Sequence, residues 1–253
     1  MIDYELNEQG VATITLNRPE KYNAFDDQLI ASFIKILKEI SNNPNVLLVN
    51  LQAQGKHFCS GADLSWMQRM VRYTEQENLH DSLQLAELME LFYTLPQPTL
   101  ASIHGAVYGG GVGLVACCDI AIASLDAKFG FSEVKLGLIP AVISPYIIKA
   151  IGARQTQRYF LTAETFDSKK AYEMGLIHQY VDINELPKTV ENIIQTILSN
   201  SSEAVYAAKQ LIHDVRDQNI TKDLLKDTAT RIAKMRVSEE AQSRLKRFLQ
   251  HDQ

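Results

Sequence analysis

Three consecutive glycines, Gly109–Gly111, lie between two apolar runs in the stretch IHGAVYGGGVGLVACCDIAIA at positions 103–123. A glycine inside a helix costs about 1 kcal/mol relative to alanine, so three in a row are unfavourable where a helix should begin. Glycine also lets another group approach the backbone, and unpaired N–H groups lie at a helix start. The run therefore favours a backbone site for an anionic ligand, or for an oxygen that develops negative charge.

The glycine run could also reflect tight packing against a neighbouring strand, or a nucleotide-binding loop. Packing stays open on the sequence alone. A nucleotide loop is excluded because the run lacks the GxGxxG register, and GxxxxGK[ST] occurs nowhere in the chain.

The rest of the sequence alternates between strand-like and helix-like patterns. The alternating or continuously apolar runs predict strands at 11–16, 46–52, 99–104 and 119–123. Asp27 is expected to cap a helix, a longer helical pattern ends before Pro96, and Ser168 and Ser201 are expected caps in the mostly helical part after Ala141. These patterns predict an α/β fold of βα crossovers with a helical C-terminal third.

Composition narrows the class of protein. The chain has 253 residues, 46% of them hydrophobic, and a formal charge of −5, so it can bury a sizeable core. Nucleic acid and anionic membranes favour a basic face, which argues against both as partners. The sequence shows no 18-residue apolar run and no signal-peptide pattern. The cysteines at 59, 117 and 118 lack metal-site spacing and are expected to be free thiols, which predicts a cytoplasmic location.

Four more segments accompany the glycine run: LNRPEKYNAF at 16–25, GKHFCSGADLSWM at 55–67, AKFGFSEVKLGLIP at 127–140 and KAYEMGLIHQYVD at 170–182. In this order, the five segments resemble the crotonase (enoyl-CoA hydratase/isomerase) family over about residues 11–182. The resemblance implies a crotonase-like spiral of βα (ββα) turns over 1–190. It also implies a helical region at 191–253 that is involved in assembly of a homotrimer or a dimer of trimers.

The resemblance further implies an acyl-CoA thioester as substrate, with no metal and no cofactor beyond the coenzyme A of the substrate. Two backbone N–H groups, of Ala62 and Gly110, are expected to hold the thioester oxygen as an enolate forms. Hydratases of the family often carry two glutamates. Glu133 matches one of them, whereas Gly113 stands at the other position, so Glu133 is expected to carry the proton transfer alone or with help from a water or another side chain.

Substrate and coenzyme A contacts also follow from the resemblance. They are expected at Lys21, Tyr22, Ala24, Ala62, Asp63, Leu64, Ser65 and Gly110.

The wider local sequence looks closest to the bacterial methylglutaconyl-CoA hydratase branch of leucine catabolism. It implies hydration of a short branched 2-enoyl-CoA, 3-methylglutaconyl-CoA, with Arg69 or Arg72 as candidates to meet the distal carboxylate. The space freed by the absent side chain at Gly113 is expected to hold a water. Two alternatives remain: an enoyl-CoA isomerase that uses the same glutamate, and a non-catalytic acyl-CoA-binding scaffold.

Overall fold

The computed structural model describes residues 1–251 and divides the chain into two compact units, Met1–Ile194 and Gln195–Gln253. The strands and all the site positions expected from the sequence lie in the first unit. No helix in the described part of the chain is both long and apolar enough to cross a membrane.

The first unit is built on a six-stranded sheet with the order β1-β2-β3-β4-β6-β9. Only the β1–β2 pair is antiparallel, and the other neighbours run parallel. The strands are β1 (Ile2–Leu6), β2 (Val11–Leu16), β3 (Leu48–Ala53), β4 (Thr99–Ile103), β6 (Ile120–Ser124) and β9 (Gln179–Val181). The four strands predicted from the sequence are confirmed to within two residues at their ends.

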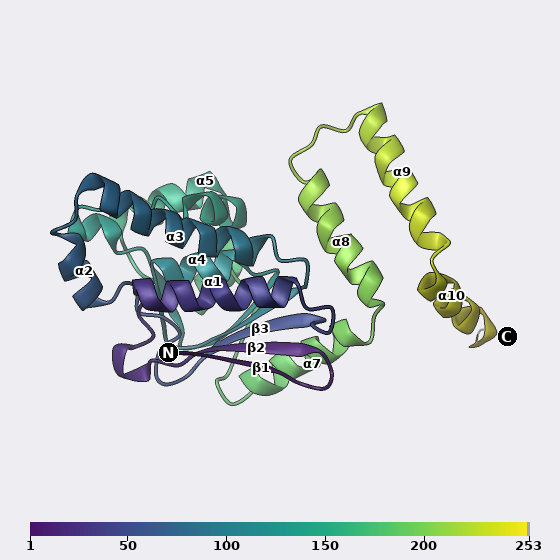
Figure 1. The fold of residues 1–253 in the computed structure, drawn as a ribbon, viewed down its shortest axis with the longest axis horizontal. Coiled ribbons are helices and arrows are strands. Elements are labelled where there is room, and N and C mark those ends of the chain that lie inside the picture. Colours follow the sequence, from purple (N-terminus) through teal and green to yellow (C-terminus); the bar gives the residue numbers. More distant parts are fainter. Residues whose placement is uncertain (252–253) are drawn as a thin grey trace. The chain divides into compact units, whose positions relative to one another are not determined.

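Helices α1 (Asp27–Ser41) and α3 (Glu75–Tyr93) pack against each other on one face of this sheet (Figure 1). Their buried faces meet at Phe33 and Phe92, whose ring centroids lie 5.8 Å apart. The N-cap of α1 is Asp26, which accepts a hydrogen bond from the N–H of Leu29 at 2.8 Å. The expected cap Asp27 is wrong by one residue, because it is already the first residue of the helix.

A smaller sheet carries the site. It has the order β5-β7-β8, with β5 (Ala106–Tyr108) parallel to β7 (Lys128–Gly130) and β8 (Phe166–Asp167) antiparallel to β7. The rings of Phe129 and Phe166 stack with centroids 5.6 Å apart and anchor this sheet in the core.

The remaining helices of the first unit are α2 (Leu64–Met70), α4 (Gly110–Cys117), α5 (Ser144–Thr162) and α6 (Ser168–Met174), and α7 (Leu186–Leu198) begins in it. Helix α6 is capped by Asp167 and not by Ser168, because the Ser168 hydroxyl donates inward to the carbonyl of Ser124 at 2.6 Å. The second unit holds α8 (Ser202–Val215), α9 (Lys222–Arg236) and α10 (Glu239–His251). Ser201 caps α8 as predicted.

Candidate active site

Main-chain pairing brings the two predicted oxyanion donors side by side. Cys59 and Val107 form a parallel bridge, in which the N–H of Cys59 donates to the carbonyl of Ala106 at 3.1 Å. Ala62 and Gly110 each follow their bridge residue by three positions, and the two segments run in the same direction. They stay adjacent beyond the bridge, since a Cβ built on Gly61 would lie 3.7 Å from the Cβ of Tyr108.

The same kind of pairing brings Glu133 to this place. The N–H of Gly109 donates to the carbonyl of Gly130 at 3.1 Å, continuing the β5–β7 ladder. Glu133 follows Gly130 by three positions. A Cβ on Gly109 would lie 3.0 Å from Oε1 of Glu133, so the carboxylate lies directly against the glycine run.

The carbonyls next to the donors show where the two N–H groups point. The carbonyl of Gly61 accepts from the N–H of Phe25 at 2.7 Å, and in a trans peptide the N–H of Ala62 points the opposite way. The carbonyl of Gly109 accepts from Val112 at 3.0 Å inside α4, so the N–H of Gly110 points out of the helix. Neither N–H has a hydrogen-bond acceptor among the described residues. Both are therefore available to an oxygen of a ligand.

A different physical reason favours glycine at each of the three positions. Gly109 has φ +52°, in the left-handed region, and faces the Glu133 carboxylate. A Cβ on Gly110 would lie 3.0 Å from the Phe25 ring, and one on Gly111 would lie 2.7 Å from the Cβ of Cys59. The sequence left two explanations of the glycine run open, a backbone donor site and tight packing. The structure shows that both apply.

The Glu133 carboxyl group is suited to proton transfer. Its Oε2 is buried and has no hydrogen-bond partner among the described residues. Burial raises the pKa of Glu133 above its ordinary value, and a hydrogen bond from its own backbone N–H offsets only part of that rise. A raised pKa brings a carboxyl group closer to the range in which it both accepts and donates a proton near neutral pH.

The space expected beside Gly113 is filled, and the expectation of a water there is wrong. Gly113 is buried in α4, where a Cβ would lie 2.4 Å from Cγ2 of Ile143 and 3.2 Å from Cε of Met89. Two apolar side chains therefore occupy the place that a second glutamate would need. No local pattern indicates this contact, because Ile143 lies far from Gly113 along the chain.

The residues expected to contact coenzyme A fall into two groups. Lys21, Tyr22, Leu64 and Ser65 are exposed, while Ala24 and Asp63 are buried. The N–H of Ala24 donates to Lys21 at 3.0 Å, and the Asp63 carboxylate caps α2 through the N–H groups of Ser65 at 2.8 Å and Trp66 at 3.2 Å. The exposed side chains can meet a ligand directly, whereas the buried pair shapes the two loops.

Asn23 holds the first of these loops and was not among the expected site residues. Its backbone has φ +55°, and its buried amide accepts from the N–H of Arg18 at 2.8 Å and donates to the carbonyls of Gln54 and His57, both at 2.8 Å. The loop at 18–25 is thereby joined to the segment before Cys59. Asparagine is among the few residues that tolerate a left-handed backbone, which is the only signal that sequence analysis could have used.

The two arginines proposed for a distal carboxylate are exposed on and just after α2. Arg69 forms an ion pair with Asp27. Arg69 therefore already has a partner within the protein. Arg72 remains a candidate to contact the distal carboxylate, on the ground of its exposure alone.

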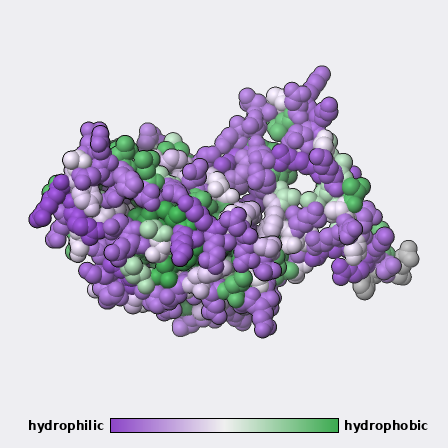
Figure 2. Space-filling view, viewed as in Figure 1, coloured by the Kyte–Doolittle hydropathy of each residue, from purple (hydrophilic) through white to green (hydrophobic). Residues whose placement is uncertain are grey.

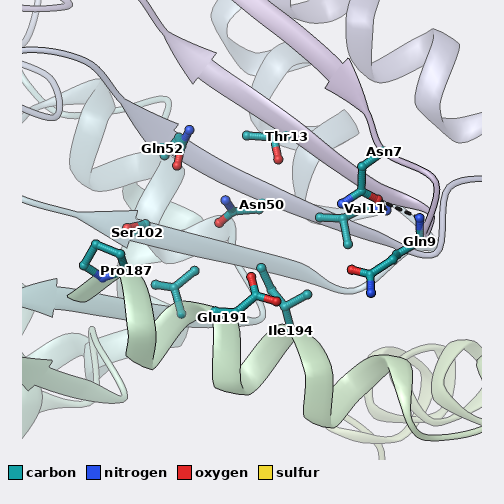
Figure 3. A pocket seen from close by; sticks show the side chains of 11 residues that line it. Asn7, Gln9, Val11, Thr13, Asn50, Gln52, Ser102, Pro187, Glu191 and Ile194 are labelled. Carbon is teal, nitrogen blue, oxygen red and sulfur yellow. Dashed lines mark hydrogen bonds between the residues drawn. The ribbon is translucent and has the colours of Figure 1, made fainter. Parts of the chain in front are cut away.

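A separate cavity of about 230 Å³ lies between β2–β4 and α7 (Figure 3). It is lined mainly by amides and hydroxyls: Asn7, Gln9, Thr13, Asn50, Gln52 and Ser102, with Glu191 and apolar side chains of α7 opposite. None of the expected site residues lines it. Side-chain amides and hydroxyls are not ionised near neutral pH, so these groups offer hydrogen bonds rather than proton transfer, and Glu191 is the ionisable side chain in the lining.

A glycine turn that begins a helix, two outward-facing N–H groups and a half-buried carboxylate on a βα spiral define the crotonase class of acyl-thioester enzymes. The enoyl-CoA hydratase/isomerase family model matches residues 6–252, and the chain belongs to this family.

Solved and curated relatives agree with the family. The fold matches an enoyl-CoA hydratase from Shewanella pealeana with a TM-score of 0.94 and 42% identity, over 99% of this chain and 93% of the other. The chain is 32% identical to the short-chain-enoyl-CoA hydratase of Clostridium acetobutylicum, over 82% of this chain and 80% of that protein. It is 31% identical to the mitochondrial Delta(3,5)-Delta(2,4)-dienoyl-CoA isomerase of Dictyostelium discoideum, over 85% of this chain and 76% of that protein. The chain is thus an enzyme of the hydratase/isomerase type, which favours catalysis over the scaffold alternative.

Proposed function

We propose that this enzyme adds water across the double bond of a short branched 2-enoyl-CoA, with Glu133 as its acid and base. The observation that carries the proposal is the buried Glu133 Oε2 without a described partner, next to the segments that present the N–H groups of Ala62 and Gly110. Exposed Lys21 and Tyr22 are proposed to meet coenzyme A. Coenzyme A enters with the substrate, and no further cofactor is needed for this chemistry.

In the proposed reaction, Glu133 removes a proton from a water as its oxygen bonds to Cβ. The double-bond electrons move to the thioester oxygen, which becomes an enolate oxygen held by the two N–H groups. Glu133 then returns the proton to Cα and the thioester carbonyl reforms. One water is consumed, and the carboxylate ends in its starting state.

Labelled water tests this proposal. In H₂¹⁸O, the heavy oxygen is expected at Cβ of a 3-hydroxyacyl-CoA, and a solvent deuteron at Cα in D₂O, both read by mass spectrometry. A product free of ¹⁸O, formed by migration of the double bond, would reject hydration.

That outcome would support the isomerase alternative, which one observation favours. Ile143 and Met89 make the side of the site at Gly113 apolar, and an isomerase needs a single carboxylate that reaches two carbons of a dry acyl chain. Hydration then requires the water to enter on the side of Glu133. A 3-enoyl-CoA offered in D₂O separates the two reactions, because only an isomerase converts it to the 2-enoyl-CoA without adding oxygen.

We further propose 3-methylglutaconyl-CoA as the preferred substrate, which would put the enzyme in leucine catabolism, and the cytoplasm as its location. The resemblance of the local sequence supports the substrate, and the free cysteines support a reducing compartment. Arg72 is the proposed contact of the distal carboxylate. Arg72→Gln is expected to raise the KM for 3-methylglutaconyl-CoA about 10-fold and leave that for crotonyl-CoA unchanged, the loss of one charged hydrogen bond. Arg69→Gln is the matched control, and equal effects on both substrates would reject the contact.

A ligand complex tests the donors. With acetoacetyl-CoA bound, the thioester oxygen is expected about 2.7–3.1 Å from the nitrogens of Ala62 and Gly110. A thioester oxygen that points elsewhere in the crystal structure would remove them from this role.

The C-terminal helical region is proposed to join subunits into a trimer or a dimer of trimers. Its surface shows apolar side chains among hydrophilic ones (Figure 2), including Leu225, Ile232, Leu245 and Phe248. Apolar side chains that gather on a surface are candidates for protein contacts. Light scattering at micromolar concentration is expected to give three or six times the 28.5 kDa chain mass, and a monomer would contradict the assembly.

A further inference from the structure

We propose that Arg18 is a positioning residue that aims the Ala62 N–H at the thioester oxygen, by clamping the backbone bridge between Phe25 and Ala62. The inference rests on the proposed function, in which Ala62 is an oxyanion donor.

The bridge is the element that Arg18 acts on. The N–H of Phe25 donates to the carbonyl of Gly61 at 2.7 Å, and the N–H of Asp63 donates to the carbonyl of Phe25 at 2.8 Å. Phe25 therefore bonds to both peptides that flank Ala62, and the Cys59 thiol adds a weak bond to the carbonyl of Gly61 at 3.8 Å. If this bridge tilts, the N–H of Ala62 tilts with it, because the Gly61–Ala62 peptide is planar.

The guanidinium group of Arg18 contacts residues on both sides of that bridge. Its Nη1 binds the Asp26 carboxylate at 2.6 Å and the carbonyl of Ala24 at 3.4 Å, the two neighbours of Phe25 in the chain. Its Nη2 lies 3.4 Å from Oδ2 of Asp63, the neighbour of Ala62. A guanidinium group spans these acceptors because its donors form a planar fork, which an ammonium group does not.

Charge explains why the position needs a cation. Asp26 and Asp63 are the N-caps of α1 and α2, and their side chains are only 13% and 6% exposed. Two carboxylates held in one poorly hydrated place repel each other unless a cation lies between them. Lys21 Nζ stands 3.7 Å from Asp63 but is half exposed, so Arg18 is the buried partner that both share.

Asp63 itself is held in its charged form. Burial raises the pKa of Asp63, but its two backbone donors and the neighbouring cations outweigh burial and lower that pKa. Asp63 thus keeps its negative charge in the neutral range, where it can pair with the guanidinium group of Arg18.

The test replaces Arg18 by methionine, which keeps an unbranched apolar stem and removes the donors. Arg18→Met is expected to lower kcat about 10- to 100-fold while KM changes less than 3-fold, because a misaligned donor acts mainly on the transition state. A bound conjugated dienoyl-CoA gives a second readout: its absorbance maximum moves to longer wavelength when the carbonyl is polarised, and this shift is expected to shrink in the variant. Arg18→Lys is expected to recover only part of either loss.

Arg158→Met is the matched control. It removes an exposed arginine that pairs with Glu164 outside this bridge, so kcat and the spectral shift are expected to stay within 2-fold of wild type. A folded Arg18→Met protein with wild-type kcat and full spectral shift would overturn the inference. If Arg18→Met does not fold, Asp63→Asn, which keeps the cap of α2, is judged by the same two readouts. Wild-type enzyme that shows no spectral shift would instead reject the donor site of the proposed function.

Discussion

Glu133→Gln is expected to lower kcat by at least about 100-fold, the lower end for removal of a positioned acid or base. Glutamine keeps the shape of the side chain but cannot accept the proton of the attacking water. Binding of acetoacetyl-CoA is expected to change far less, since the two backbone donors are untouched. Initial rates and a ligand titration measure the two effects. Near-normal turnover by the folded variant would remove Glu133 from the role.

The pH dependence of the wild type gives an independent check. Because burial raises the pKa of Glu133, the acidic limb of the kcat/KM profile is expected to have its midpoint above the ordinary value of 4.5. This limb is expected to be absent from the residual activity of Glu133→Gln. A midpoint at or below 4.5 would contradict the buried, desolvated state of the carboxyl group.

The raised pKa of Glu133 also predicts how the stability of the fold changes with pH. A carboxyl group whose pKa is raised by folding favours the folded state while protonated and loses that contribution as pH rises through the folded pKa. Ionised Glu133 therefore destabilises the fold at neutral pH. The free energy of unfolding of Glu133→Gln minus that of the wild type is expected to increase from pH 4 to pH 7, as measured by urea denaturation.

Gly113→Glu is expected to destabilise the fold by more than about 3 kcal/mol, and not to create a two-carboxylate site. The new Cβ would overlap Ile143, and overpacking typically costs about 1–3 kcal/mol. A carboxylate placed among Ile143 and Met89 adds the further cost of an unpaired buried charge. The gain in helix propensity over glycine, below about 1 kcal/mol, is smaller than the two costs together.

A double-mutant cycle isolates the steric part. Gly113→Ala and Ile143→Ala are each expected to destabilise, but the double variant less than the sum of the two, because the alanine methyl enters the space that Ile143 leaves. Thermal or urea unfolding measures all three. Additive effects would show that the two positions are not in contact.

Local patterns predicted the strands and the start of α4, because apolar periodicity and glycine placement act over a few residues. The neighbouring pair Asp26–Asp27 shows the limit of such patterns. Either carboxylate could cap α1, and packing of the apolar face of the helix selected Asp26.

Contacts between positions far apart in the chain could not be predicted from local sequence patterns. Ile143 against Gly113 depends on how α5 packs on α4, and the Arg18–Asp63 pair joins positions 45 apart in the chain. The family resemblance supplied the expected roles of Ala62, Gly110 and Glu133, while periodicity alone supplied only a glycine-rich helix start.

The equal three-residue offsets from Cys59, Val107 and Gly130 have a consequence for protein engineering. Substitutions around the acyl group leave the ladder hydrogen bonds in place, so libraries of side chains can search for new substrates without moving the donors. A single-residue insertion or deletion within these offsets shifts a donor or the carboxylate by about 3.8 Å, more than the length of a hydrogen bond. Redesign of this enzyme for other thioesters should therefore vary residue identity and hold the loop lengths constant.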